Sequence, residues 1–223
     1  MAKKSLIFAP HPDDELLGVG GTILKRKSMG NEVAVVYVTE IEKGVKWSSD
    51  DAAIQKDQVH SVCESINFDR VYFCSFPSTK LDELSFSSII DKFSYFIADF
   101  KPNEIFVPHF SDIHSDHKIV YNAAISCTKV FRYPFIQSVL AYETLSETDF
   151  SMMPDLNFMP NYFVNISNFL DSKIENLKLY QSELDEFPFP RSIDAIEALA
   201  KVRGVAAGFT AAEAFQLLKA TEE

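Results

Sequence analysis

Hydrophobic residues in this sequence follow two periodicities. Short unbroken apolar runs, of which 33–38 is the clearest, are typical of strands buried on both faces of a parallel sheet. Longer stretches such as 85–99 repeat their apolar residues at three- and four-residue spacing and predict helices with one buried face. By these criteria, strands are expected at 5–10, 33–38, 70–74, 105–107, 136–142 and 162–166. Helices are expected at 16–29, 51–66, 85–99, 116–130, 168–182, 192–203 and 210–220.

The predicted strands and helices alternate along most of the chain. A repeated strand–helix order predicts an α/β fold, in which a mostly parallel sheet lies between helices on both faces. Long connections are expected at 40–50 and 144–160. No internal repeat, low-complexity tract or interdomain linker is visible, so residues 1–223 are expected to form a single domain.

Composition and charge narrow the class of protein. Hydrophobic residues make up 47% of the chain and charged residues 24%, which is ordinary for a soluble globular protein. The net charge is −11 and no stripe of Lys and Arg is present, which argues against binding to nucleic acid or to an anionic membrane. No apolar run is long enough to span a membrane, and no signal-peptide core follows the first residues. The three scattered cysteines, Cys63, Cys74 and Cys127, fit a reducing cytoplasm better than a disulfide framework.

Polar residues interrupt the apolar pattern directly after the first predicted strand. The chain from Pro10 reads Pro-His-Pro-Asp-Asp-Glu, so a His and three acids follow the strand at a sharp turn. Ligands of open α/β sheets bind just outside the carboxyl ends of strands. His11 and Asp14 are close enough along such a turn to hold one metal ion, and Asp13 is then free beside a metal-bound water. The alternative is that these acids only favour the N-terminus of the following helix.

A second polar cluster follows the fourth predicted strand. Three of the five histidines lie between residues 109 and 117, and His114 and His117 share one face if a helix begins there. Ser115 or Asp116 can cap that helix. Two His and one carboxylate around a divalent ion, with a position left for water, are typical of a catalytic metal site rather than a structural one.

The two motifs together resemble those of the PIG-L/LmbE superfamily of metal-dependent N-deacetylases. The resemblance rests on the run Pro10 to Glu15 with its trailing Gly20-Gly21, on His114-Ser115-Asp116-His117, and on a similar tail at 203–215. It covers nearly the whole chain and implies a Rossmann-like, three-layer αβα fold in a single LmbE-like domain. Members deacetylate N-acetylglucosaminyl conjugates, and the form of the second motif looks like that of the bacterial sugar-deacetylase branch. The resemblance therefore implies a zinc-dependent hydrolase of an N-acetylated amino sugar or sugar conjugate.

The resemblance also implies a role for each motif residue. His11, Asp14 and His117 are the implied metal ligands, with zinc expected and ferrous iron as an alternative. Asp13 is the implied general base, and His114 stabilises the oxyanion or protonates the leaving amine. Asp116 orients a neighbouring His, for which His114 is the first choice.

A few residues outside the motifs carry open alternatives. Trp47 stacks on a sugar, closes over the site as a lid or anchors its loop. Arg132 and Arg191 either hold a substrate oxygen or acetate, or form surface salt bridges. Glu143 either binds a substrate hydroxyl or is a solvated acid, and the glycines at 18–21 are interpreted as close packing rather than a dinucleotide loop. Asp112, Ser78 and Lys80 depart from the pattern of the family, which leaves the substrate and the residues that bind the sugar unassigned.

Two other classes of function stay open at this point. One is a different metal-dependent hydrolase, a phosphoesterase or an amidase acting on a non-sugar amine, although a two-metal phosphoesterase needs more carboxylates than the motifs supply. The other is a non-catalytic sugar-binding module. Members of the family often form trimers or hexamers, so a homo-oligomer is an expected partner, with the N-acetyl sugar as the small-molecule ligand.

Overall fold

A seven-stranded sheet runs through the computed structural model, which describes residues 2–42, 44 and 47–222. Its strands lie in the order β3-β2-β1-β4-β5-β7-β6. The first five are parallel to one another, and β7 runs antiparallel to both of its neighbours, β5 and β6. In chain order the strands are β1 (Lys4–Ala9), β2 (Glu32–Glu40), β3 (Arg70–Pro77), β4 (Glu104–Pro108), β5 (Ser138–Tyr142), β6 (Tyr162–Asn165) and β7 (Ala212–Ala220).

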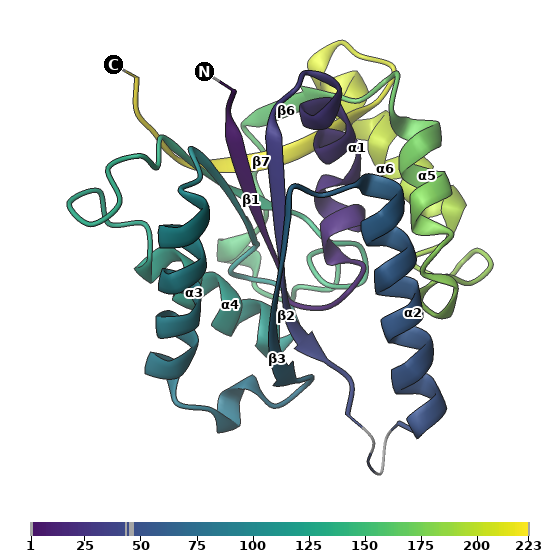
Figure 1. Cartoon of the computed structure of the whole chain (residues 1–223). Helices are drawn as coiled ribbons and strands as arrows, with labels where there is room; N and C mark the ends of the chain where they lie inside the picture. Colours follow the sequence, from purple (N-terminus) through teal and green to yellow (C-terminus); the bar gives the residue numbers. More distant parts are fainter. Residues whose placement is uncertain (1, 43, 45–46, 223) are drawn as a thin grey trace.

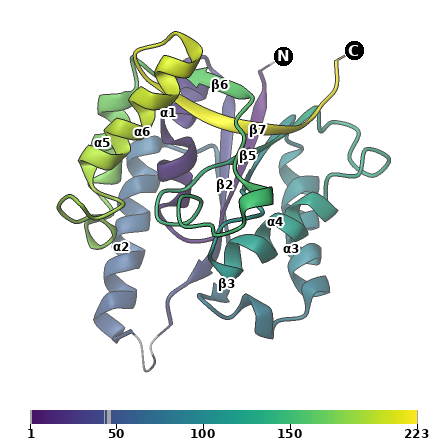
Figure 2. The ribbon, with the colours of Figure 1, turned by 180° about the vertical axis from the view of Figure 1, so that it is seen from behind.

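Helices cover both faces of the sheet, as Figures 1 and 2 show from opposite sides. One face packs against α1 (Asp14–Ser28), α2 (Ser49–Ile66), α5 (Leu170–Leu177) and α6 (Ile193–Ala207). The other face packs against α3 (Phe86–Phe100) and α4 (Ser115–Ser126). The three-layer α/β architecture predicted from the sequence is therefore confirmed.

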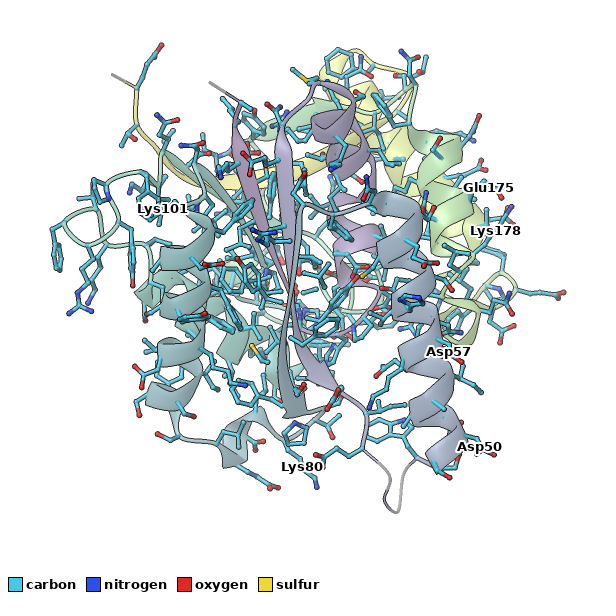
Figure 3. All side chains as sticks on the ribbon, viewed as in Figure 1. Asp50, Asp57, Lys80, Lys101, Glu175 and Lys178 are labelled. Carbon is cyan, nitrogen blue, oxygen red and sulfur yellow. The ribbon has the colours of Figure 1, made fainter. Side chains whose placement is uncertain are left out.

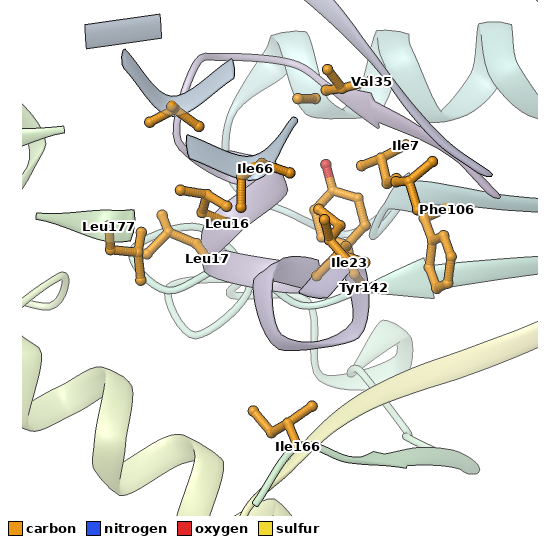
Figure 4. Close-up of a cluster of buried hydrophobic side chains, with 14 of the residues drawn as sticks. Ile7, Leu16, Leu17, Ile23, Val35, Ile66, Phe106, Tyr142, Ile166 and Leu177 are labelled. Carbon is orange, nitrogen blue, oxygen red and sulfur yellow. The ribbon is translucent and has the colours of Figure 1, made fainter. Parts of the chain in front are cut away.

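The core consists of two clusters, one on each face of the sheet. Neighbouring residues of a strand point to opposite faces, so Ile7 belongs to one cluster and Phe8 to the other. Figure 4 shows the first cluster, in which Leu16 and Ile23 of α1 lie with Ile7 of β1 and Phe106 of β4. This packing fixes α1 against the centre of the sheet, directly after the turn that carries the first motif.

Charged side chains lie on the outer faces of α2 and α5. Asp50 and Asp57 on α2, Glu175 on α5 and Lys178 directly after α5 are exposed and project away from the ribbon (Figure 3). In the described part of the chain, no helix combines the length and the apolar character that crossing a bilayer requires.

The glycines in the first half of α1 allow close packing, as the sequence indicated. A Cβ atom on Gly18 would lie 2.3 Å from Cδ2 of Tyr142, and one on Gly21 would lie 2.7 Å from Cγ2 of Ile166. Both distances are shorter than carbon atoms tolerate, so α1 approaches β5 and the end of β6 only because these side chains are absent.

We expect Gly18→Ala to destabilise the fold. The new methyl group would push the buried Tyr142 ring, and overpacking of this kind outweighs the helix propensity gained, for a net loss of about 1–2 kcal/mol. The free energy of unfolding in urea measures the effect. Gly44→Ala is the control, because among the described residues the nearest atom to its Cβ, the Glu42 carbonyl oxygen, is 3.9 Å away. A Gly18→Ala protein as stable as the control would contradict this account of the packing.

The most informative differences between the predicted and observed elements concern one strand and two helices. Residues 210–220 were predicted to be a helix, but Ala212–Ala220 forms β7, which pairs with β5 on one side and with the edge strand β6 on the other. Its Ala, Glu, Leu and Lys residues favour helix locally, and pairing on both sides overrides that preference. The helix predicted at 116–130 already ends at Ser126, which leaves Val130 54% exposed instead of in the core. The helix predicted at 168–182 is shorter, because α5 covers only Leu170–Leu177.

Candidate functional site

Both sequence motifs lie at the carboxyl ends of neighbouring parallel strands. β1 and β4 pair directly, and each is followed by a turn and a helix. The first turn is held to β2, because Thr39 donates to the Pro10 carbonyl oxygen from its backbone N–H at 3.0 Å and from its hydroxyl at 2.8 Å. The pairing of β1 with β4 thus brings residues 11–15 and 112–117 together.

His11, Asp14 and His117 form a compact cluster. Their ligand atoms all lie within 4.8 Å of one another. Oδ2 of Asp14 is 3.5 Å from Nδ1 of His11 and 3.3 Å from Nε2 of His117. Burial disfavours a charge on His117, but Asp14 and Asp112 raise its pKa well above the ordinary value, so this position favours positive charge. The cluster is therefore built to hold a positive charge.

A metal ion fits this cluster. Nε2 of His117 is fully buried and makes no well-aligned hydrogen bond with any described residue, although Oδ2 of Asp14 lies 3.3 Å away and polar atoms in a protein interior are normally paired. Burial would raise the pKa of Asp14, but His117 and His11 keep it well below its ordinary value, so the carboxylate is charged. An unpaired imidazole nitrogen, a second imidazole and a carboxylate form a donor set that suits a divalent ion such as zinc.

Asp112 supports His117 from behind. Its Oδ2 lies 2.8 Å from Nδ1 of His117, and its Oδ1 accepts a hydrogen bond of 2.7 Å from the Thr148 hydroxyl. Such a carboxylate fixes the ring and keeps the proton on Nδ1 when Nε2 is a ligand. The sequence analysis noted Asp112 only as a departure from the family pattern, although an acid five residues before a ligand His was a usable signal.

Asp116 contacts a different His from the one favoured in the sequence analysis. Its Oδ2 lies 3.1 Å from Nε2 of His11, and it also accepts a 2.7 Å hydrogen bond from the Thr79 N–H. Nδ1 of His114 is 3.9 Å from the same oxygen. The N-cap of α4 is His114, and not Ser115 or Asp116 as the sequence analysis expected. Asp116 therefore lies in the first turn of α4, where its side chain contacts His11 in the loop after β1.

The cap of α4 determines the tautomer of His114. Nδ1 of His114 accepts a 3.1 Å hydrogen bond from the Asp116 N–H, so a neutral ring carries its proton on Nε2. Burial and the neighbouring His11 lower the pKa of His114 to about 4. At neutral pH, His114 is therefore a neutral hydrogen-bond donor.

Asp13 lies beside the cluster and is not engaged by the helix that follows it. It precedes α1 at the N-cap position, yet its carboxylate makes no capping hydrogen bond. Burial raises the pKa of Asp13 well above its ordinary value, and the charges of Asp14 and Glu183 act in the same direction. Arg191 opposes them, with its Nε 3.8 Å from Oδ2 of Asp13.

A pocket of about 380 Å³ opens at the cluster. His11, Asp13 and Asp14 line this pocket. Trp47 and Arg191, for which the sequence analysis left alternatives open, line it as well. Residues that the sequence analysis missed are Glu147, whose carboxylate accepts from the His114 N–H, and Glu183, which pairs with Arg191. Arg132 and Glu143 lie elsewhere: Arg132 stacks on Phe131, and Glu143 forms a salt bridge with Arg203.

The family described as GlcNAc-PI de-N-acetylase (PIG-L) matches residues 6–128, which is 123 of the 223 residues. The chain belongs to this PIG-L family. The match contains both motifs and confirms the resemblance on which the sequence analysis relied. It ends at residue 128, so α5, α6 and the pocket residues beyond it are outside the matched region.

Two relatives share a similar level of identity with the chain. Diacetylchitobiose deacetylase of Thermococcus kodakarensis is 23% identical over 196 residues, which cover 82% of this chain and 71% of that protein. The probable N-acetyl-alpha-D-glucosaminyl L-malate deacetylase 2 of Bacillus cereus is 24% identical over 197 residues, with 83% and 86% covered. Both names describe deacetylases of N-acetylated sugar compounds.

Solved structures show how widely the fold is used. N,N'-diacetylchitobiose deacetylase from Pyrococcus horikoshii matches with a TM-score of 0.77 at 22% identity, over 98% of this chain and 84% of that one. GalB, a 4-carboxy-2-hydroxymuconate hydratase from Pseudomonas putida, matches equally well, with a TM-score of 0.77 at 15% identity over 99% of each chain. The fold alone therefore does not select the reaction, and the argument for function depends on the site.

Proposed function

We propose that this PIG-L family protein is a metal-dependent N-deacetylase, which hydrolyses the amide of an N-acetylated amino sugar or sugar conjugate to the free amine and acetate. One observation carries the proposal: the unpaired, buried Nε2 of His117 lies with Asp14 and His11, and the uncapped carboxylate of Asp13 stands beside them. We propose zinc as the ion held by His11, Asp14 and His117, with ferrous iron as the alternative.

A bound divalent ion would lower the pKa of a water molecule and polarise the acetyl carbonyl group. Asp13 acts as the general base that accepts the proton from the attacking water. Its raised pKa suits this task, because a base works best when its pKa approaches the working pH. The role also requires that Asp13 is not itself a ligand, since a coordinated carboxylate is a poor base.

His114 acts as a hydrogen-bond donor in this proposal. Its neutral ring carries the proton on Nε2, so it can stabilise the negative charge that develops on the acetyl oxygen. Its lowered pKa favours this donor role over transfer of a second proton to the leaving amine. The leaving amine therefore receives its proton from Asp13, and Asp116 serves to orient His11.

The decisive experiment measures amine release from a panel of N-acetylglucosamine conjugates, with the metal content determined on the same preparation. We expect release that a chelator abolishes and that zinc restores, with about one ion per chain. Phosphate release from phosphoesters without amine release would favour the alternative hydrolase. Metal-loaded protein that binds the sugars but never releases amine would favour a binding module.

We expect His114→Ala to slow the chemistry and to keep the metal. Loss of one donor to an oxyanion typically costs about 10²–10³-fold in kcat. The measurement is kcat with the metal content of the same sample. His60→Ala is the control, because His60 is exposed on α2. Loss of the ion in His114→Ala would instead make His114 a ligand, as its second cluster with His11 and Asp116 would permit.

Several expectations from the sequence stay predictions. These are the single domain over residues 1–223, the cytoplasmic location and bacterial branch, and a homo-oligomer in the form of a trimer or hexamer. The residues that bind the sugar are also unassigned, although Trp47 and Arg191 line the pocket.

A further inference from the structure

Glu15 is a buried acid that the mechanism proposed above does not use. Its side chain has no exposed surface. The Tyr180 hydroxyl donates to its Oε1 at 2.7 Å and the Tyr37 hydroxyl at 3.0 Å, while its Oε2 accepts a 3.1 Å hydrogen bond from the Asp13 N–H. Burial raises the pKa of Glu15 to about 7, which reflects how unfavourable a carboxylate is at this position. The fold keeps the acid nevertheless and surrounds it with neutral donors.

The backbone that Glu15 holds has an unusual conformation. Asp13 has φ 126° and ψ −32°, a region that residues with a side chain rarely adopt. Such a conformation persists only where the surroundings impose it. At Asp13, hydrogen bonds hold both backbone polar groups. The carboxylate of Glu15 accepts one from the Asp13 N–H, and the Asp13 carbonyl oxygen accepts one each from the N–H groups of Leu16 and Leu17, at 2.9 Å.

This conformation decides what the Asp13 carboxylate can do. An Asp directly before a helix normally has an extended backbone, and its side chain then caps the first turn by accepting a backbone N–H. Ser48 and Ser192, which precede α2 and α6, follow this rule with φ −80° and −67° and with capping hydrogen bonds. Asp13 departs from it in both respects, so its carboxylate is left for the pocket.

We infer that Glu15 is a positioning residue for Asp13: by holding the Asp13 N–H, it keeps the backbone at positive φ and so prevents the carboxylate from capping α1. Tyr37 from β2 and Tyr180 from the chain after α5 hold the second carboxylate oxygen of Glu15, so the acceptor cannot swing away. The inference rests on the proposed function, because it assigns a purpose to the free Asp13 carboxylate.

The test compares Glu15→Leu, Glu15→Gln and Glu104→Leu. Leucine has nearly the same shape as the acid but accepts no hydrogen bond, whereas glutamine keeps an oxygen for the Asp13 N–H. Glu104 is the matched control, because it is another buried acid, at the amino end of β4 and therefore at the other end of the sheet from the site. For each protein we would measure kcat, KM, metal content and the hydrogen exchange of the Asp13 amide.

We expect Glu15→Leu to lower kcat by about 10–100-fold, with KM within about twofold and the metal content unchanged, because a small misplacement of a catalytic group is costly. Exchange of the Asp13 amide should accelerate at least tenfold. Glu15→Gln should recover most of the lost kcat and of the amide protection. Glu104→Leu should keep the kcat of the unchanged protein, even if its free energy of unfolding falls.

Unchanged kcat in Glu15→Leu would overturn the inference, as would a loss of kcat that merely follows a loss of metal. If Glu15→Leu does not fold, the double variant Tyr37→Phe and Tyr180→Phe tests the same point, since it releases Oε1 but keeps the acid. Faster Asp13 exchange with lower kcat would then support the inference, and lower kcat with unchanged exchange would refute it. Absence of deacetylase activity in the unchanged protein would refute the proposed function instead, while the exchange data would still report on the backbone.

Discussion

Replacing Asp13 by asparagine is expected to lower kcat by about 10²–10⁴-fold and to leave the metal bound. Asparagine has the size of aspartate, so the pocket and the cluster of His11, Asp14 and His117 should keep their shape. Its amide oxygen, however, cannot accept a proton from water at neutral pH. The variant therefore separates the base from the ligands, which no substitution within the metal cluster can do.

The measurement for Asp13→Asn is amine release under saturating substrate, with metal content determined in parallel. Asp57→Asn is the control, because it makes the same chemical change on the exposed face of α2. Turnover equal to that of the unchanged protein would remove Asp13 as the base. Loss of the ion would mean that Asp13, and not only Asp14, is a ligand.

His117→Ala is expected to abolish both metal binding and activity. His117 supplies the only completely buried imidazole of the cluster, and Asp112 and Thr148 hold its ring in place. Removing it leaves His11 and Asp14 alone, and two ligands do not hold zinc against dialysis as three do. We expect less than about one tenth of the metal to stay after dialysis, with a matching loss of kcat.

Metal analysis after dialysis, followed by addition of excess zinc, tests this prediction. The exposed His60 again provides the control, since His60→Ala removes an imidazole without touching the cluster. Full metal content in His117→Ala would refute its role as a ligand. Activity that excess zinc restores fully would show that the remaining residues suffice, which is contrary to the proposal.

The regular half of the fold could be predicted from the sequence. The strands from β1 to β5 and the helices between them carry strong local patterns, and their parallel order follows from the alternation. β7 could not be predicted in this way. Its Ala, Glu, Leu and Lys residues favour a helix, and the segment forms a strand because it pairs with β5 on one side and with β6 on the other. Local preference is a weak guide where a segment is paired on both sides.

The site shows the same division between local and distant information. Spacing indicated His11 and Asp14, and the resemblance to the family added His117; the structure brings the three together because β1 pairs with β4. The partner of Asp116 depends on how the cap of α4 turns its first residues, and spacing does not encode this. The environment of Glu15 depends on Tyr180, which is 165 residues away, so no local pattern could identify it.

The packing around α1 has a consequence for how the protein folds as it is synthesised. In the middle of this helix, Glu213 of β7 accepts hydrogen bonds from the Gly21 and Thr22 N–H groups, and Lys173 of α5 donates to the Leu17 carbonyl oxygen. Lys173 and Glu213 also form a buried ion pair 2.7 Å long. The helix that follows the first motif therefore leaves the ribosome long before the residues that complete its packing. β6 also cannot join the sheet before β7 does, because β7 lies between it and β5. The nascent chain can assemble its parallel strands early, but the helix beneath the site gains its final support only when the last strand enters the sheet.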